Sequence, residues 1–286
     1  MIEIKGAGFV NKGAELMLLA TLQELNSRGY NNKSAVNLRV GDYNKRNSSG
    51  LKHLFYIETG KYPFLSNISM MLGNSIPKGI KTKFNIVSKS DINTILDISG
   101  FALGDQWGTK NTEKMANLTR KWKSEGKKII LLPQAFGPFE NKGNREAFLE
   151  VLNNVDMIYA RDKVSYNYIC DIAHNTENVR LSPDFTNLIK GEKPKTYNSS
   201  NLEVAIIPNK KMMDKTDNKT REHYVSFLVK SAKYLLNNGF KPFILIHEYN
   251  TDYQIGLDIQ RKLEAEIEIV QEKDPLVIKG IINNCL

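Results

Sequence analysis

The sequence has few of the residues that build metal clusters and disulfide frameworks. Its 286 residues include two cysteines and four histidines, and Cys170 and Cys285 stand far apart without neighbouring metal-ligand patterns. It contains no His-Glu-x-x-His sequence, no Cys-x-x-Cys pair, no Asp-rich calcium loop and no Walker loop. We therefore expect no metal site, no bound cofactor and a reducing, cytoplasmic compartment.

Long apolar runs are also missing. No stretch approaches the roughly 18 apolar residues that a membrane-spanning helix needs, and the run Ile129–Leu132 ends at Pro133. The first residues, MIEIKG, lack the basic and then apolar order of a signal peptide and instead predict a strand. Apolar residues still make up 41% of the chain, which is enough to exclude a disordered protein.

Acidic residues are outnumbered, with 31 Asp and Glu against 40 Lys and Arg, which gives a formal charge of +9. Such a surface favours anionic partners: phosphorylated metabolites, acidic lipid headgroups or nucleic acid. The lysines are spread along the chain, and no basic stripe alternates with aromatic residues at a recognisable spacing. We therefore expect no nucleic-acid partner.

Strand and helix patterns alternate along the first part of the chain, which predicts an α/β fold. Short runs that are apolar throughout suit parallel strands buried on both faces. The predicted strands are Ile2–Lys5, Val36–Val40, Thr94–Ser99, Lys128–Leu132, Met157–Ala160 and Val179–Ser182. The predicted helices are Glu15–Leu25, Glu113–Lys123, Arg145–Leu152 and Lys163–Ile172. Residues 41–90 have a broken pattern, from which we expect an irregular excursion with one helix near Ser66–Leu72.

A polar stretch, Lys190–Asn201, predicts a linker between two Rossmann-like domains, residues 1–190 and 201–286. After it come three strand–helix units: Leu202–Ile207 with Arg221–Asn238, Pro242–His247 with Asp252–Ala265, and Ile267–Val270 with Pro275–Asn284. Asp274 is expected to cap the last helix before Pro275. Three strands make an incomplete second domain, so we expect a further segment in relatives or a partner chain, such as a homo-oligomer, at its edge.

Polar motifs follow several predicted strands at their carboxyl ends, where open α/β sheets bind ligands. The first turn, with Gly6, Gly8 and Gly13, lets the backbone approach a ligand, although its spacing is not that of a dinucleotide fingerprint. The others are Asp97-Ile98-Ser99-Gly100 with Gly104-Asp105, Pro133-Gln134-Ala135-Phe136-Gly137-Pro138, Ala160-Arg161-Asp162 and Pro183-Asp184-Phe185.

In this order the motifs resemble those of the polysaccharide pyruvyl transferase family, as do Ile246-His247-Glu248 and the final Lys279–Cys285 segment. The resemblance runs from residue 1 to about 285. It implies a two-domain fold like that of GT-B glycosyltransferases. It also implies transfer of pyruvyl from phosphoenolpyruvate, as co-substrate, to a pair of sugar hydroxyls as a ketal. The implied partners are phosphoenolpyruvate and a saccharide acceptor, free or lipid-linked, in cell-surface polysaccharide biosynthesis. Peripheral association with a membrane stays open.

The sequence departs from the family pattern in two places. Ala14 stands where the opening motif usually carries an acid, and the chain ends at Leu286, before the family's Ser-Arg-x-His segment. The Arg and His of that segment are expected to bind phosphoenolpyruvate and to serve as acid and base. No position in this sequence takes over those roles. One interpretation is therefore that the chain is a truncated and inactive member of the family.

Candidate site residues follow from the motifs. Arg161 is the first candidate for binding an anion, because a guanidinium grips carboxylate or phosphate with two hydrogen bonds. The alternative is a structural Arg paired with Asp162 or Asp184. His247 and Glu248 are the candidates for acid–base catalysis. The remaining substrate-binding candidates are Asn11, Gly13, Glu15, Ser99, Asp105, Gln134 and Asp184. For Asn11 and Glu15, helix capping and first-turn charge are the alternative.

Other functions stay open on the sequence alone. A GT-B glycosyltransferase that uses a nucleotide sugar would need a diphosphate-binding group in the second domain, for which His247-Glu248 is the candidate. A non-catalytic protein that binds a sugar or a partner chain is the other alternative.

Overall fold

The computed structural model describes residues 1–56, 63–193 and 202–286. The chain divides into two compact units. Unit 1 comprises Met1–Val10 and Ala14–Ile189, and unit 2 comprises Asn11–Gly13 and Lys190–Leu286. Most of the predicted linker, residues 194–201, lies outside the described residues.

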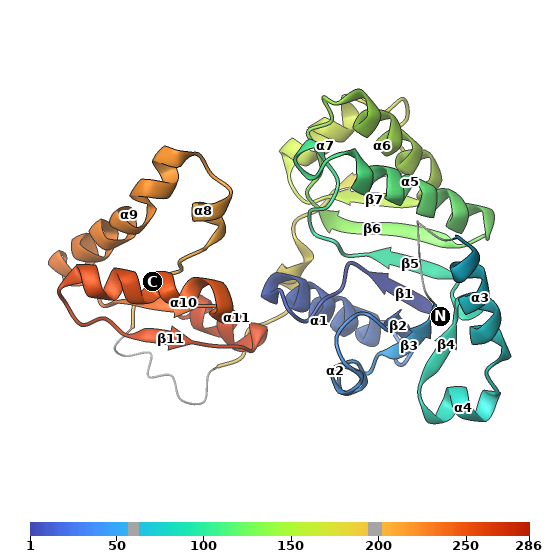
Figure 1. Ribbon diagram of the computed structural model, residues 1–286, viewed down its shortest axis with the longest axis horizontal. Helices are drawn as coiled ribbons and strands as arrows, with labels where there is room; N and C mark the ends of the chain where they lie inside the picture. The colour runs from blue at the N-terminus through green and yellow to red at the C-terminus, as the bar shows by residue number, and fades with distance from the viewer. Residues whose placement is uncertain (57–62, 194–201) are drawn as a thin grey trace. The chain divides into compact units, whose positions relative to one another are not determined.

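Unit 1 is built on one parallel sheet of eight strands (Figure 1). Its strands are β1 (Ile2–Lys5), β2 (Ser34–Asn37), β3 (Lys52–Phe55), β4 (Ile86–Ser88), β5 (Thr94–Asp97), β6 (Lys128–Gln134), β7 (Met157–Ala160) and β8 (Val179–Leu181). The six strands predicted for this region are all present, and β1 and β7 have the predicted bounds. Apolar runs form these strands because helices cover both faces of a parallel sheet.

The strand order is β4-β3-β2-β1-β5-β6-β7-β8. The chain therefore builds the sheet in one direction from β1 through β4 and in the other direction from β5 through β8. Every adjacent pair is parallel, so all eight carboxyl ends lie on one edge of the sheet. The order reverses between β1 and β5, and a reversal of this kind opens a crevice where α/β proteins bind ligands.

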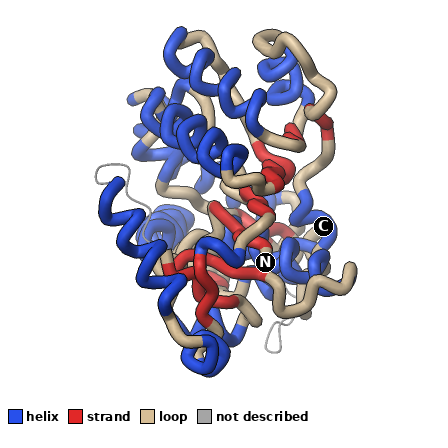
Figure 2. The backbone as a smooth tube through the Cα atoms, turned by 90° about the vertical axis from the view of Figure 1, so that its right-hand side faces the viewer, coloured by secondary structure: helices blue, strands red, loops and turns tan. Residues whose placement is uncertain are grey.

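Helices flank the sheet of unit 1, as the tube drawing of helices and strands shows (Figure 2). They are α1 (Lys12–Ser27), α2 (Tyr43–Ser48), α3 (Pro63–Ser75), α4 (Lys78–Lys83), α5 (Thr109–Ser124), α6 (Lys142–Asn154) and α7 (Lys163–Cys170). Three short 3-10 helices, η1 (Lys89–Asp91), η2 (Asp105–Trp107) and η3 (Phe185–Leu188), join them. The first residues of α1 group with unit 2.

The prediction of an irregular excursion over residues 41–90 is wrong. The described residues of this region hold two strands, β3 and β4, and three helices, of which the sequence predicted only the one that is α3. The two strands are short, with four residues in β3 and three in β4. In addition, His53 in β3 is buried as a polar residue and accepts a hydrogen bond at Nδ1 from Arg46 Nε at 2.9 Å.

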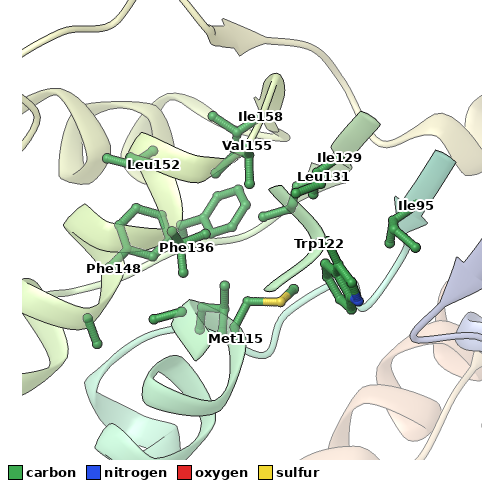
Figure 3. Packing of buried hydrophobic residues seen from close by; sticks show 14 of the residues in the cluster. Ile95, Met115, Trp122, Ile129, Leu131, Phe136, Phe148, Leu152, Val155 and Ile158 are labelled. Carbon is green, nitrogen blue, oxygen red and sulfur yellow. The ribbon is translucent and has the colours of Figure 1, made fainter. Parts of the chain in front are cut away.

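The main hydrophobic core of unit 1 lies between the sheet and helices α5 and α6 (Figure 3). Trp122 of α5 and Phe148 of α6 are almost completely buried there, against Ile129 and Leu131 of β6. Burying an aromatic side chain of this size contributes about 2–3 kcal/mol. The start of α6 is fixed by Asn141, whose side chain accepts a hydrogen bond from Asn144 N at 3.2 Å.

Unit 2 has a parallel sheet of three strands in the order β11-β10-β9. Its strands are β9 (Val204–Ile206), β10 (Pro242–Ile246) and β11 (Ile269–Gln271), and its helices are α8 (Lys211–Asp214), α9 (Asn218–Asn237), α10 (Tyr249–Leu263) and α11 (Pro275–Asn283). All three predicted strand–helix units are present. Asp274 caps α11 as predicted, because its carboxylate accepts a hydrogen bond from Leu276 N at 2.8 Å.

The predicted fold class is confirmed: the chain is an α/β protein with two parallel sheets. Within the described residues, the helices are all too short or too polar to cross a membrane.

Candidate functional site

The turn after β1 and the turn after β5 meet at the carboxyl edge of the unit 1 sheet. Gly6 has a φ of +76°, and a Cβ at this position would lie 2.5 Å from the backbone nitrogen of Ser99. Only glycine fits such a contact at a positive φ. Gly6 therefore brings the first motif against the Ser99-Gly100 motif, at the reversal of strand order.

Asn11, Gly13 and Glu15 lie around the start of α1. The Asn11 Oδ1 atom is close to Gly13, 3.2 Å from where a Cβ would stand, and Glu15 is the acidic residue of the first helical turn. A negative charge in this position interacts favourably with the helix N-terminus, by about 0.3–1 kcal/mol. Glu15 thus stands where the alternative of first-turn charge placed it, and Asn11 and Gly13 stay candidates for substrate binding.

The loops that follow β5 and β6 are bonded to each other along their backbones. Ala135 N donates to Gly100 O at 2.8 Å, Gly137 N to Leu103 O at 3.1 Å, and Asp105 N to Pro138 O at 3.0 Å. The two motifs that carry Asp105 and Gln134 therefore form one platform at the carboxyl edge of the sheet.

The carboxylate of Asp105 is occupied within this platform. Its Oδ2 accepts hydrogen bonds from Glu140 N at 2.7 Å and Asn141 N at 3.2 Å, and its Oδ1 accepts one from Asn144 Nδ2 at 2.7 Å. Asp105 thus fixes the loop that leads into α6. The structure gives it a positioning task, and any contact with a sugar hydroxyl would have to share these oxygens.

Asp97 and Gln134 form a buried pair between β5 and β6. Gln134 Nε2 donates to Asp97 Oδ1 at 3.1 Å, and Ser99 N donates to the same oxygen at 3.1 Å. Burial raises the pKa of the Asp97 carboxyl, and these hydrogen bonds oppose the shift. Within the described residues, Gln134 Oε1 is buried without a hydrogen-bond partner. The sequence analysis quoted Asp97 in a motif but did not select it, since the predicted strand ran on to Ser99, whereas in the structure β5 ends at Asp97.

Arg161 directly follows β7, and its guanidinium Nη1 lies 3.5 Å from Asp184 Oδ2, with each side chain 34% exposed. Asp184 also accepts hydrogen bonds from Thr186 N and Thr186 Oγ1, at 2.9 and 2.8 Å, which fix the start of η3. Of the two acids considered as structural partners of Arg161, Asp184 is the one in contact. A guanidinium carries five N–H donors, so one carboxylate contact leaves donors for an anion.

The other acid, Asp162, anchors the helix beside Arg161. Its carboxylate accepts from Ser165 N at 2.8 Å and from Ser165 Oγ at 3.1 Å, and Ser165 Oγ accepts from Phe136 N at 3.0 Å. This series of hydrogen bonds connects the end of β7 to the loop after β6. Arg161 therefore stands on rigid backbone, at the same edge of the sheet as the turn after β1.

Unit 2 brings a second group of functional side chains together at the carboxyl end of its central strand. His247 follows β10, and its Nδ1 lies 3.7 Å from Asp252 Oδ2 in the first turn of α10. Asp252 is 1% exposed, and its other oxygen accepts from Lys210 N at 2.8 Å. The imidazole is partly exposed, so the histidine lies between the buried carboxylate and the solvent.

Asp252 is a site residue that the sequence analysis missed. Its spacing from His247, five residues across a strand-to-helix turn, was the only signal. Its Oδ1 accepts a hydrogen bond from the backbone nitrogen of Lys210, in the loop after β9. That loop is held in turn by Tyr224, whose hydroxyl accepts from Asn209 N at 2.9 Å and whose pKa is raised, chiefly by burial.

A metal ion is chemically possible at this point of unit 2. His247, Glu248 and Asp252 each offer one ligand atom, and these atoms lie within 4.8 Å of one another. One imidazole and two carboxylates form a mixed donor set that suits several divalent ions. The expectation of no metal site rested on the absence of known metal-binding sequence motifs. The spacing of His247, Glu248 and Asp252 does not correspond to any of those motifs.

Comparison with known proteins gives one family. The family model described as polysaccharide pyruvyl transferase matches residues 11–286. No curated protein matches the sequence significantly.

Solved structures share the architecture at low sequence identity. Anabaena Alr3699/HepE in complex with UDP and glucose superimposes with a TM-score of 0.54 and 11% identity, over 98% of this chain and 72% of that one. Its complex with UDP-glucose gives a TM-score of 0.54 and 11% identity, over 97% and 71%. The complex with UDP gives 0.54 and 9%, over 97% and 71%. These values show the fold, which is GT-B-like.

Proposed function

We propose, from the premise that the chain belongs to the polysaccharide pyruvyl transferase family, that it transfers pyruvyl from phosphoenolpyruvate to two hydroxyls of a saccharide as a cyclic ketal. The observation that carries the proposal is the family match, which extends over nearly the whole chain. The acceptor belongs to a cell-surface polysaccharide or to its lipid-linked precursor.

The reaction sets three chemical requirements. One hydroxyl oxygen bonds to C2 of phosphoenolpyruvate while an acid protonates its methylene carbon to a methyl group. The second hydroxyl oxygen then bonds to C2, the bond from C2 to the phosphate oxygen breaks, and phosphate leaves with the remaining proton. An anion clamp, a proton donor and a proton acceptor are therefore needed.

Arg161 suits the anion clamp. It is partly exposed, it stands at the carboxyl edge of the unit 1 sheet, and its backbone is held by Arg161 N donating to Gln134 O at 3.0 Å. Its contact with Asp184 orients the guanidinium without using all its donors. We assign it the carboxylate or the phosphate of phosphoenolpyruvate.

His247 suits proton transfer. Its Nδ1 faces the buried carboxylate of Asp252, so Nε2, on the other side of the ring, is the nitrogen that would exchange a proton with a reacting group. Glu248 is the adjacent alternative. Asn11, Glu15 and Ser99 stay candidates for the acceptor sugar.

The test is direct binding and turnover. Titration calorimetry measures the affinity for phosphoenolpyruvate, and phosphate release is followed with oligosaccharides that carry free hydroxyl pairs. We expect Arg161→Gln to weaken phosphoenolpyruvate binding about 10- to 100-fold, as the loss of charged hydrogen bonds implies. Arg28→Gln, at an exposed arginine of the same unit, is the matched control and should leave the affinity unchanged.

Two outcomes would contradict the proposal. One is the absence of both phosphoenolpyruvate binding and phosphate release with every acceptor. The other is binding of a nucleotide sugar in its place, which supports the glycosyltransferase alternative.

A further inference from the structure

Helix α3 exposes four of its large apolar residues, while small and polar residues and the partly buried Met70 line its inner side. Ser66 and Ser69 are buried against the protein, as is Gly73. On the opposite face, Phe64 is 71% exposed, Met71 68% and Leu72 57%, and Leu65 is exposed as well. A surface helix of a globular protein normally shows the reverse arrangement. We call these four exposed residues the α3 apolar face: Phe64, Leu65, Met71 and Leu72.

Contacts on the inner side fix this orientation. Ser88 Oγ of β4 donates to Gly73 O at 2.6 Å, and Ser90 Oγ donates to Asn74 Oδ1 at 2.7 Å. A Cβ on Gly73 would lie 2.9 Å from Phe55 O, so the helix packs directly on the β3 backbone. Turning the apolar residues inward would break these hydrogen bonds and place large side chains where a glycine barely fits. The outward apolar face is therefore built into the packing.

Helix α4 follows α3 and also exposes large apolar side chains. Ile80 and Phe84, one turn apart, are both exposed. Figure 1 shows α3 and α4 beside β4, the edge strand of the sheet. Residues 63–84 contain three lysines, Lys78, Lys81 and Lys83, and no acidic residue.

We propose that the α3 apolar face, together with α4, docks the protein on an anionic lipid surface. Phe, Leu and Met side chains on one face of a helix insert into the boundary between headgroups and acyl chains, and lysines beside them contact acidic headgroups. The absence of any acid over residues 63–84 favours this partner over a protein surface, which would present charges of both signs. Such a helix lies in the interface and does not span it. This inference concerns lipid binding and does not depend on pyruvyl transfer.

The experiment is co-sedimentation with vesicles, either neutral phosphatidylcholine or a mixture that contains phosphatidylglycerol. We expect binding to the anionic vesicles that weakens with added salt. The triple variant Phe64→Gln, Met71→Gln, Leu72→Gln should lose at least ten-fold in affinity. The variant Lys78→Gln, Lys83→Gln should lose affinity for anionic vesicles only, by about five-fold for each lysine.

The matched control replaces exposed aromatic residues elsewhere. Phe227→Gln, Tyr234→Gln changes two exposed residues of α9 and should bind vesicles like the unaltered protein. All the substituted apolar residues are exposed, so unfolding temperatures should stay close to that of the unaltered protein.

Three results would overturn the proposal. They are no vesicle binding by the unaltered protein, equal binding by the triple variant, and self-association through this face without vesicle binding, detected by light scattering. None of them bears on phosphoenolpyruvate affinity, so failure here is distinct from failure of the proposed function.

Discussion

The Nδ1 atom of His247 and the Oδ2 atom of Asp252 face each other at 3.7 Å, and within the described residues neither atom has a hydrogen-bond partner. A small movement of the imidazole would close this distance to a hydrogen bond. Burial of the carboxylate makes such a bond strong, because little solvent competes for it. Asp252 is therefore placed to fix which ring nitrogen of His247 carries the proton.

Replacement of His247 and of Asp252 should impair turnover to different degrees. We expect His247→Gln to lower the rate of phosphate release about 10²- to 10⁴-fold, as loss of a positioned acid–base group does. Asp252→Asn should lower kcat less, with little change in the affinity for phosphoenolpyruvate, because it acts only through the histidine. Asp258→Asn, at an acid farther along α10, is the control and should keep full activity. Equal kcat for Asp252→Asn and the unaltered protein would remove the positioning role.

A pair of glycine substitutions separates steric contact from backbone strain in the turn after β1. Gly6 and Gly29 have nearly the same φ, +76° and +80°, but a Cβ on Gly6 would meet Ser99 N at 2.5 Å while one on Gly29 would meet nothing within 4 Å. Gly29→Ala should cost about 1–2 kcal/mol of stability from the positive φ alone. Gly6→Ala should cost about 1–3 kcal/mol more. Urea unfolding measures both, and equal losses would show that the two turns are not in contact.

The sequence predicted those elements whose signal is local. Strands β1 and β7 were predicted to the residue because continuous apolar runs are what a doubly covered parallel strand requires. Strands β3 and β4 were missed because part of their burial is polar. Buried His53 accepts a hydrogen bond from Arg46, and Arg46 in turn donates from Nη1 to Leu38 O at 2.8 Å and Gly41 O at 2.6 Å. A hydropathy pattern cannot register a buried residue whose partner lies elsewhere in the chain.

The candidate site residues show the same difference between local signals and signals that depend on distant parts of the chain. Arg161 and His247 were selected because strand ends are visible in the sequence. Asp97 and Asp252 were not, since their importance depends on neighbours that only the fold supplies, Gln134 on the adjacent strand and Lys210 in a loop 42 residues away. Motif position thus identifies the edge of a sheet, and the hydrogen bonds show which side chains position others.

A buried ion pair between β1 and η1 offers a test of electrostatics in unit 1. Lys89 Nζ lies 2.7 Å from Glu3 Oε2, with side chains 2% and 3% exposed, and Lys5 Nζ lies 3.8 Å from the other oxygen of Glu3. Burial is the main cause that lowers the pKa of Lys89, and the charges of Lys127 and Lys5 add to it. One carboxylate thus interacts with two ammonium groups, those of Lys89 and Lys5.

Removing that carboxylate should therefore cost more than removing one ammonium group. We expect Glu3→Gln to destabilise unit 1 by about 3–5 kcal/mol, the usual cost of breaking a buried pair. Lys89→Met should cost less, because Glu3 keeps Lys5 nearby, and the double variant should be more stable than Glu3→Gln alone. Both tryptophans, Trp107 and Trp122, lie in unit 1, so their fluorescence in urea reports its unfolding. A larger loss for Lys89→Met than for Glu3→Gln would contradict this account.

The raised pKa of Asp97 predicts a pH dependence of stability with a definite sign. Burial raises this pKa above the ordinary value of 3.8, so over the interval between the two values the folded state holds a proton that the unfolded state releases. The contribution of Asp97 to stability is therefore fully present below the unfolded pKa and is lost as pH rises through the folded pKa.

Asp97→Asn removes the titration while Asn Oδ1 can still accept from Ser99 N and Gln134 Nε2. The free energy of unfolding of the variant, minus that of the unaltered protein, should increase from pH 4 upward and become constant above the folded pKa. Tryptophan fluorescence in urea at several pH values measures this difference, with Asp171→Asn, at an exposed acid of unit 1, as the control that should show no such trend. A difference that falls with rising pH would mean that Asp97 is a stabilised carboxylate in the folded state.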